Sequence, residues 1–189
     1  MEFSDLVKLR KSVRHYEDKK PSRDLIIKCI ESARMSPSAC NSQPWSFIIV
    51  DDNDLISKVS SYCTPPVGNM NKFDQNAPVI IVQIMEKTNN IASTIGSEMT
   101  DHEFNYIDTG LVMGTLCLQA ATLGLGTCIL GYFHEKEIKE VLDIPANIRI
   151  GLLCTIGFEK GGQKESPKVR KPLEKMISFN GYSGFAVEL

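Results

Sequence analysis

The chain has 189 residues, of which 42% are hydrophobic and 23% are charged. These fractions are ordinary for a globular protein and exclude a disordered, collagen-like or disulfide-stapled chain. The 21 basic and 23 acidic residues give a formal net charge of -2 at pH 7, so no overall positive field attracts nucleic acid or an anionic membrane. We therefore expect a single domain over residues 1–189, with no nucleic acid and no membrane among its partners.

The cysteines and histidines do not favour a metal site. The six cysteines form no C-x-x-C pair, and the three histidines lie far from one another and from any cysteine at ligand spacing. We expect reduced thiols and no bound metal. The chain begins with acidic residues where a secretory signal would have a basic head and an apolar core, so we expect a cytoplasmic protein.

Helical and extended patterns follow one another along the chain. In chain order they predict a short helix before Arg10, a helix over Arg23–Met35 capped by Ser22, a strand over Trp45–Val50, a helix over Leu55–Tyr62, a strand over Pro78–Met85, a helix over Ile107–Leu125, a strand over Thr127–Leu130, a helix over Glu135–Leu142 and a strand over Ile148–Phe158. The polar stretches Glu86–Glu103 and Lys160–Pro167 predict surface loops. This order suggests a layered α/β or α+β fold and leaves the topology open.

The segment Ile107–Leu125 predicts a buried helix that is too polar to span a membrane. Apolar residues nearly encircle it, and Gly110 and Gly114 lie four residues apart, a spacing that lets another helix approach closely. Two arrangements are open. The helix either contributes to a dimer interface or lies wholly inside one subunit.

Two basic clusters are the first candidates for a binding site. Arg10, Lys11, Ser12 and Arg14 follow the short N-terminal helix, and a second group covers Lys168–Lys171. Guanidinium and hydroxyl donors hold phosphate groups well, and two such clusters side by side would suit a phosphorylated cofactor. The alternative is a solvated basic surface, which composition by itself favours.

The segment Ser36–Trp45 joins a predicted helix to a predicted strand and is dense in small polar residues, with proline fixing φ at two positions. Such a stiff loop can present hydroxyl, amide and backbone groups to a flat heteroaromatic ring. A capped connector between the two elements is the alternative.

The glycine-rich stretch Leu123–Gly131 follows a helix and precedes a strand, which is the wrong order for a dinucleotide-binding turn. Gly124 is instead typical of a helix C-cap, and Gly131 of a point where backbone approaches a ligand closely. No pattern marks a catalytic triad or a paired-carboxylate site, so hydrolysis has no positive support.

Three motifs, in this order, resemble the flavin-dependent nitroreductase family: R-x-S-x-R at residues 10–14, P-S-x-x-N-x-Q-P-W at residues 37–45, and L-G-L-G-T-C-x-x-G at residues 123–131. The resemblance extends from about Leu6 to Ile177. It implies an α+β fold of three layers, with a central, mostly antiparallel sheet flanked by helices. It also implies an intertwined homodimer with one FMN in each of two sites built from both subunits.

Carried over position by position, the resemblance implies which residues contact FMN. Arg10, Lys11, Ser12 and Arg14 resemble the first FMN anchor, and Lys168 with Arg170 the late phosphate pair. Pro37, Ser38, Ala39 and Asn41 match the loop that the partner subunit lays against the flavin ring, and Asn69 with Lys72 resembles a pair at the pyrimidine edge. Leu130 and Gly131 fall where the family places backbone near flavin N5.

The reaction implied by the resemblance takes hydride from NADH or NADPH onto flavin N5 and passes electrons to a nitroaromatic, quinone or other small acceptor by a ping-pong scheme. It needs no side-chain nucleophile. Three alternatives stay open: a flavin carrier or sensor without efficient turnover, a related dehalogenating or flavin-modifying enzyme on the same fold, and an interaction domain without flavin. Cys40, beside the expected ring position, is either redox active or simply small.

Overall fold

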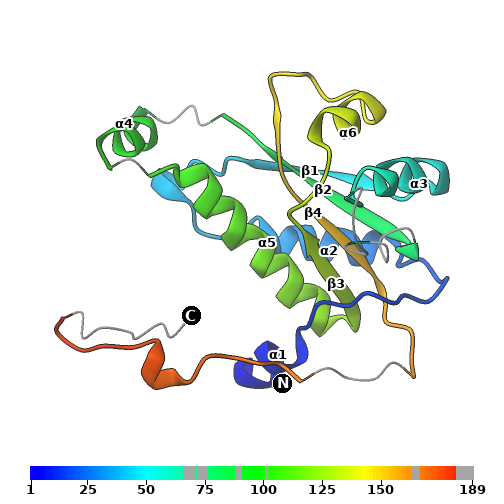
Figure 1. The fold of residues 1–189 in the computed structure, drawn as a ribbon, viewed down its shortest axis with the longest axis horizontal. Helices are drawn as coiled ribbons and strands as arrows, with labels where there is room; N and C mark the ends of the chain where they lie inside the picture. The colour runs from blue at the N-terminus through cyan, green and yellow to red at the C-terminus, as the bar shows by residue number, and fades with distance from the viewer. Residues whose placement is uncertain (66–70, 72–75, 88–90, 101, 163–166, 182–189) are drawn as a thin grey trace.

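The fold is built on a four-stranded antiparallel sheet (Figure 1). The computed structural model describes the chain except for residues 66–70, 72–75, 88–90, 101, 163–166 and 182–189. In the order in which they pair, the strands are β1 (Trp45–Val50), β2 (Val79–Met85), β4 (Arg149–Phe158) and β3 (Leu125–Leu130). Each neighbouring pair is antiparallel, so the expectation of a mostly antiparallel sheet is confirmed.

The helices follow the predicted order with one addition. They are α1 (Phe3–Leu9), α2 (Arg23–Ala33), α3 (Asn53–Ser61), α4 (Ile91–Thr100), α5 (Phe104–Thr122) and α6 (Glu135–Val141), together with the short 3-10 turns η1 (Ala39–Asn41) and η3 (Leu173–Lys175). Ser22 caps α2 as expected, because its hydroxyl oxygen accepts a hydrogen bond from the backbone N–H of Leu25. Gly124 ends α5 with a positive φ of 73°, as the C-cap prediction requires.

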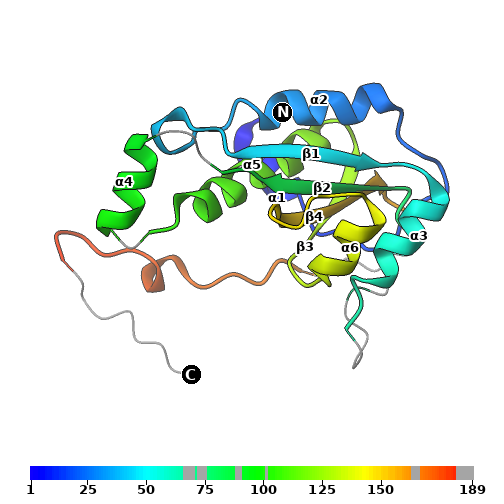
Figure 2. The same ribbon diagram turned by 90° about the horizontal axis from the view of Figure 1, so that it is seen from above.

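Alternating side chains of β2 divide the core between the two faces of the sheet. Val79 and Ile81 contribute to a cluster that also holds buried residues of α2 and α5. Ile80 and Val82 contribute to the opposite cluster, with residues of α3 and α6. The result is the expected three-layer arrangement, with α2 on one side of the strands and α3 and α6 on the other (Figure 2).

The prediction of a surface loop over Glu86–Glu103 is wrong, because this stretch contains α4. Ile91, Ile95 and Met99 recur every four residues, yet all three are exposed, and the residue that this helix buries is Ser93. Serine, threonine and glycine are poor helix formers, and the apolar stripe does not face the core. Both features weaken the sequence signal. Of the predicted loop Lys160–Pro167, residues 163–166 lie outside the described part of the chain.

The described residues cover one side of α5 and leave the other side exposed. Its inner face buries Val112, Met113 and Leu116 completely. On its outer face Ile107 and Leu111 are 53% and 45% exposed, and a Cβ added at Gly110 or Gly114 would meet no described atom within 4 Å. This exposure does not fit a helix wholly inside one subunit.

No helix within the described residues combines the length and the hydropathy that a bilayer span requires. The same residues contain no group of three or more His, Cys, Asp or Glu side chains that could hold a metal ion. Five of the six cysteines, all of which the structure describes, are buried, and Cys40 is the exposed one.

The segment that follows α1 crosses the ends of β3 and β4. The backbone N–H of Val13 donates to the carbonyl of Thr127 at 2.8 Å, and the Tyr16 hydroxyl lies 2.7 Å from the Thr155 hydroxyl. A Cβ on Gly126 would lie 2.5 Å from a methyl carbon of Val13. The glycine therefore lets the basic segment approach the sheet, and these contacts fix where Arg10, Ser12 and Arg14 lie.

We predict that Gly126→Ala destabilises the protein. The added methyl group has to displace Val13, and such overpacking of a buried contact costs about 1–3 kcal/mol. We expect a lower thermal unfolding midpoint than in Gly161→Ala, a matched control in which the new Cβ would meet no described atom within 4 Å. Equal midpoints for the two variants would show that the packing of Val13 on β3 does not require a glycine at position 126.

Candidate functional site

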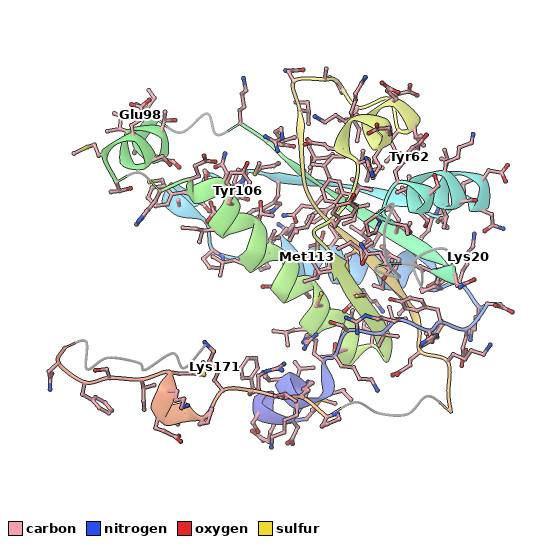
Figure 3. The ribbon with its side chains drawn as sticks, viewed as in Figure 1. Lys20, Tyr62, Glu98, Tyr106, Met113 and Lys171 are labelled. Atoms are coloured by element: carbon pink, nitrogen blue, oxygen red, sulfur yellow. The ribbon has the colours of Figure 1, made fainter. Side chains whose placement is uncertain are left out.

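Lys168 joins the C-terminal segment to the end of α1. Its Nζ donates to the carbonyl oxygen of Val7 at 3.0 Å, and also to those of Lys8 and Arg10. The last carbonyls of a helix lack partners within the helix, so an ammonium group stabilises them. The contact places the two basic clusters side by side, where Figures 1 and 3 show the C-terminal segment, with Lys171, passing α1.

The two groups of cations form one basic cluster, made up of Arg10, Lys11, Lys168 and Arg170, whose charges repel one another. Desolvation lowers the pKa of the Lys168 ammonium, and the charges of Arg10, Arg170 and Lys11 lower it further. Glu159 offsets part of this charge, since its carboxylate oxygen lies 3.0 Å from the Lys11 Nζ. A dianion bound among these groups would relieve the repulsion and raise the pKa of Lys168.

A cleft of about 860 Å³ opens beside the basic cluster. Small-molecule sites commonly have volumes of roughly 300–1,000 Å³. The lining residues include Lys8, Arg10, Lys11, Lys168, the acids Asp5 and Glu159, and the junction of α5 and β3 from Gly124 to Thr127. The cleft can therefore hold a small ligand that carries its negative charge at the α1 end.

Leu130 and Gly131 lie at the other end of β3 from this cleft. Thr127, which lines the cleft, precedes Leu130 by three strand residues, or about 10 Å. The Leu130 side chain is buried in the core, 2% exposed, so only its backbone could contact a ligand. Gly131 is exposed, and a Cβ there would meet no described atom within 4 Å.

The loop over residues 36–43 adopts an unusual backbone conformation. Cys40, Asn41 and Gln43 have positive φ values of 52°, 53° and 45°, a region that residues other than glycine seldom adopt. The Ser38 hydroxyl accepts a hydrogen bond from the Gln43 N–H at 2.9 Å. The backbone N–H of Ala39 donates to the Asp108 carboxylate, with both oxygens at 3.2 Å.

Helix α5 separates this loop from the basic cluster. The loop is attached at Asp108, near the start of the helix, whereas the cleft is lined by Ala121, near its end. Thirteen residues of α-helix span about 20 Å. Figure 1 accordingly shows α1 at the carboxyl end of α5 and the loop between α2 and β1 at its amino end. Within one chain the expected FMN contacts thus form separate groups.

The structure places the expected site residues as follows. Arg10, Lys11 and Lys168 line the same cleft, and Arg170 is near enough for its charge to lower the pKa of Lys168. Ser12 is next to this cluster on the segment that pairs with β3, and the exposed Arg14 donates to the Ser12 carbonyl at 3.4 Å. Pro37, Ser38, Ala39 and Asn41 lie on the distant loop, while Asn69 and Lys72 fall outside the described residues.

Sequence reasoning missed Asp108. It counts as a polar interruption of an apolar segment, and its carboxylate is only 3% exposed in the structure. Burial raises the pKa of this carboxyl group, and the hydrogen bond from Ala39 opposes the change. The available signal was that Asp108 is the one charged residue of α5, and a buried charge requires hydrogen-bond donors.

The chain thus has the architecture of an α+β protein, with an antiparallel sheet between two helical layers and a basic cleft at the start of β3. The sequence profile of the Nitroreductase family matches residues 7–158. This match covers more than half of the chain, which therefore belongs to the nitroreductase family.

Individual relatives agree with this assignment. The oxygen-insensitive NADPH nitroreductase of Helicobacter acinonychis is 26% identical over 176 residues, which cover 79% of this chain and 82% of that protein. The structure of an FMN-dependent nitroreductase from Clostridium difficile superposes with a TM-score of 0.71 at 26% identity, covering 93% of this chain and 98% of that one. The iodotyrosine deiodinase of Thermotoga neapolitana is 23% identical over 193 residues, covering 92% and 94% of the two chains.

Proposed function

We propose that this chain is an FMN-dependent oxidoreductase that takes hydride from NADH or NADPH and reduces a nitroaromatic, quinone or other small acceptor. One observation carries the proposal: four cations from the two ends of the chain meet beside an open cleft. Similarity to relatives named for FMN and for NADPH supports both the cofactor and the donor.

The residues of this face fit the phosphate end of FMN. Arg10 and Arg170 would hold the phosphate group through their guanidinium donors. Lys168, whose three N–H donors go to carbonyl groups, would contribute its charge, because a dianion lowers the free energy of cations that otherwise repel one another. Ser12 would add a neutral donor. The backbone of β3 from Gly126 to Leu130 would line the path from the phosphate toward the ring.

When bound, FMN supplies the hydride chemistry, which no side chain of this protein has to provide. The chain's own residues bind and orient. Arg14, exposed beside Ser12, can place positive charge near the flavin, which stabilises negative charge that develops on reduction. Leu130 and Gly131 would contribute backbone groups near the reacting edge, since the Leu130 side chain is committed to the core.

We further propose a homodimer in which each site combines the basic cluster of one subunit with the 36–43 loop of the other. The residues of α5 that border the two parts, Asp108 and Ala121, lie about 20 Å apart along the helix, and a second chain would bring the parts of two subunits together. The outer face of α5 and the C-terminal segment supply apolar surface for such an interface. In that segment Val169, Leu173 and Phe179 are 83%, 66% and 85% exposed.

The first test is an anaerobic absorbance spectrum of the purified protein before and after addition of NADH, and then of NADPH. We expect a flavin spectrum that bleaches with at least one donor, because the exposed backbone at Gly131 leaves the expected reacting edge open. Flavin that neither donor bleaches would favour a carrier or sensor. Protein that cannot be loaded with FMN would contradict the proposal.

The affinity for FMN should fall as pH rises through the lowered pKa of Lys168. Phosphate binding favours protonated Lys168, whose pKa in the free protein is lowered by burial and by neighbouring cations. Affinity is therefore full below that pKa and declines, by up to about tenfold per pH unit, once Lys168 titrates. Fluorescence titration from neutral into alkaline pH measures this decline.

Lys168→Arg should flatten this pH dependence, because a guanidinium stays charged throughout the range. Lys20→Arg is the matched control, since Figure 3 shows Lys20 on the opposite side of the molecule from Lys171. An equally steep decline in Lys168→Arg and Lys20→Arg would remove Lys168 from the phosphate site.

A mixed dimer tests the two-chain site. Arg10→Ala damages the basic cluster, and Asn41→Gly removes the loop amide while tolerating the positive φ. We expect each homodimer to bind FMN weakly. A purified heterodimer of the two variants should recover one site of wild-type affinity, because one of its two sites receives both intact parts. Heterodimers that bind no better than the homodimers would assign both parts to the same subunit.

A further inference from the structure

Asp108 is a buried carboxylate whose charge no cation among the described residues pairs. It lies on α5, it is 3% exposed, and its hydrogen bonds come from the backbone N–H of Ala39. Burying a carboxylate charge opposes folding, and hydrogen bonds to the carboxylate offset only part of the lost hydration. The position of Asp108 therefore calls for an explanation other than stability.

The contact it makes joins the 36–43 loop to α5. Three residues of this loop, Cys40, Asn41 and Gln43, have positive φ values, and such conformations persist only when surrounding contacts impose them. Within the loop, the Ser38 hydroxyl accepts a hydrogen bond from the Gln43 N–H, and the Ser38 and Ala39 carbonyls accept from the N–H groups of Asn41 and Ser42. The buried Ser42 hydroxyl has no partner among the described residues. Contacts from outside the loop must supply the remaining restraint.

Helix α5 supplies that restraint at two points. Asp108 accepts from Ala39 at the centre of the loop, and Thr115, two turns later, accepts from the Ser36 hydroxyl at 2.9 Å at the loop's start. The Ala39 contact is the one that acts on η1 itself, directly before the residues with reversed φ. Losing it would leave a peptide N–H without an acceptor in a partly buried position.

We propose that Asp108 is a positioning residue that holds the 36–43 loop in its reversed conformation and thereby sets the surface that Pro37, Ser38 and Asn41 present to the flavin. The inference rests on the proposed function, in which this loop meets the flavin of the partner subunit. Asp108 acts through the Ala39 N–H and does not itself touch the cofactor. Its role requires a hydrogen-bond acceptor at this position rather than a charge.

Three variants separate this role from ordinary packing. Asp108→Leu removes the acceptor, Asp108→Asn keeps one acceptor oxygen without the charge, and Thr109→Val alters the next residue of the helix, which is equally buried and hydrogen-bonds within α5. Each is purified in apo and FMN-loaded forms. Thermal unfolding of the apoprotein, amide exchange at Ala39 and FMN affinity are then compared with those of the unsubstituted chain.

We expect Asp108→Leu to unfold cooperatively at a lower temperature, because the Ala39 N–H loses its acceptor. It should exchange the Ala39 amide at least tenfold faster and bind FMN at least tenfold more weakly. Asp108→Asn should restore both exchange and binding to within about threefold, and Thr109→Val should leave both unchanged. A Leu variant with wild-type exchange and affinity overturns the inference, as does an Asn variant as impaired as Leu.

The two proposals fail in different ways. If the unsubstituted chain cannot be loaded with FMN, the proposed function fails, while amide exchange at Ala39 still reports whether Asp108 holds the loop. If the unsubstituted chain binds FMN and Asp108→Leu binds it equally well, only the role of Asp108 fails. If Asp108→Leu does not fold, rapid exchange of the Ala39 amide in the unsubstituted chain would overturn the inference by itself.

Discussion

The packing of α5 on the sheet determines where every part of the candidate site lies. Its inner face buries Val112, Met113 and Leu116 against the sheet and α2, so the helix cannot shift without opening the core. Its amino-terminal half holds the 36–43 loop, and its carboxyl-terminal end borders the basic cleft. Because an α-helix is stiff, its length sets the separation of these two groups. This separation is the structural reason for the proposed site built from two chains.

Electrostatics in the cleft follow from a structural contact. The Lys168 ammonium donates hydrogen bonds to backbone carbonyls at the end of α1 and so stabilises that end of the helix. These bonds also place its charge beside Arg10. The chain carries a net charge of -2, so the positive potential here is local and arises from the placement of a few side chains. One group thus contributes to the fold and to the potential that would attract a phosphate.

The parts of the fold that could be predicted are those governed by neighbouring residues. The Ser22 cap, the apolar run of β2 and the C-cap at Gly124 depend on local backbone chemistry and were evident from the sequence. The hydrogen bond from Lys168 to Arg10 spans 158 positions, and no local pattern encodes it. Asp108 and α4 were missed because small or polar residues there face inward, against the usual hydrophobic pattern.

The exposed outer face of α5 has a consequence for how ligand binding depends on dilution. If this face is covered by a second copy, and if each site needs parts from both, then assembly and ligand binding are linked equilibria. Ligand would then favour the assembled form, and dilution would release ligand together with the partner. The apparent affinity would not be a constant of the single chain, since it would vary with the total protein concentration.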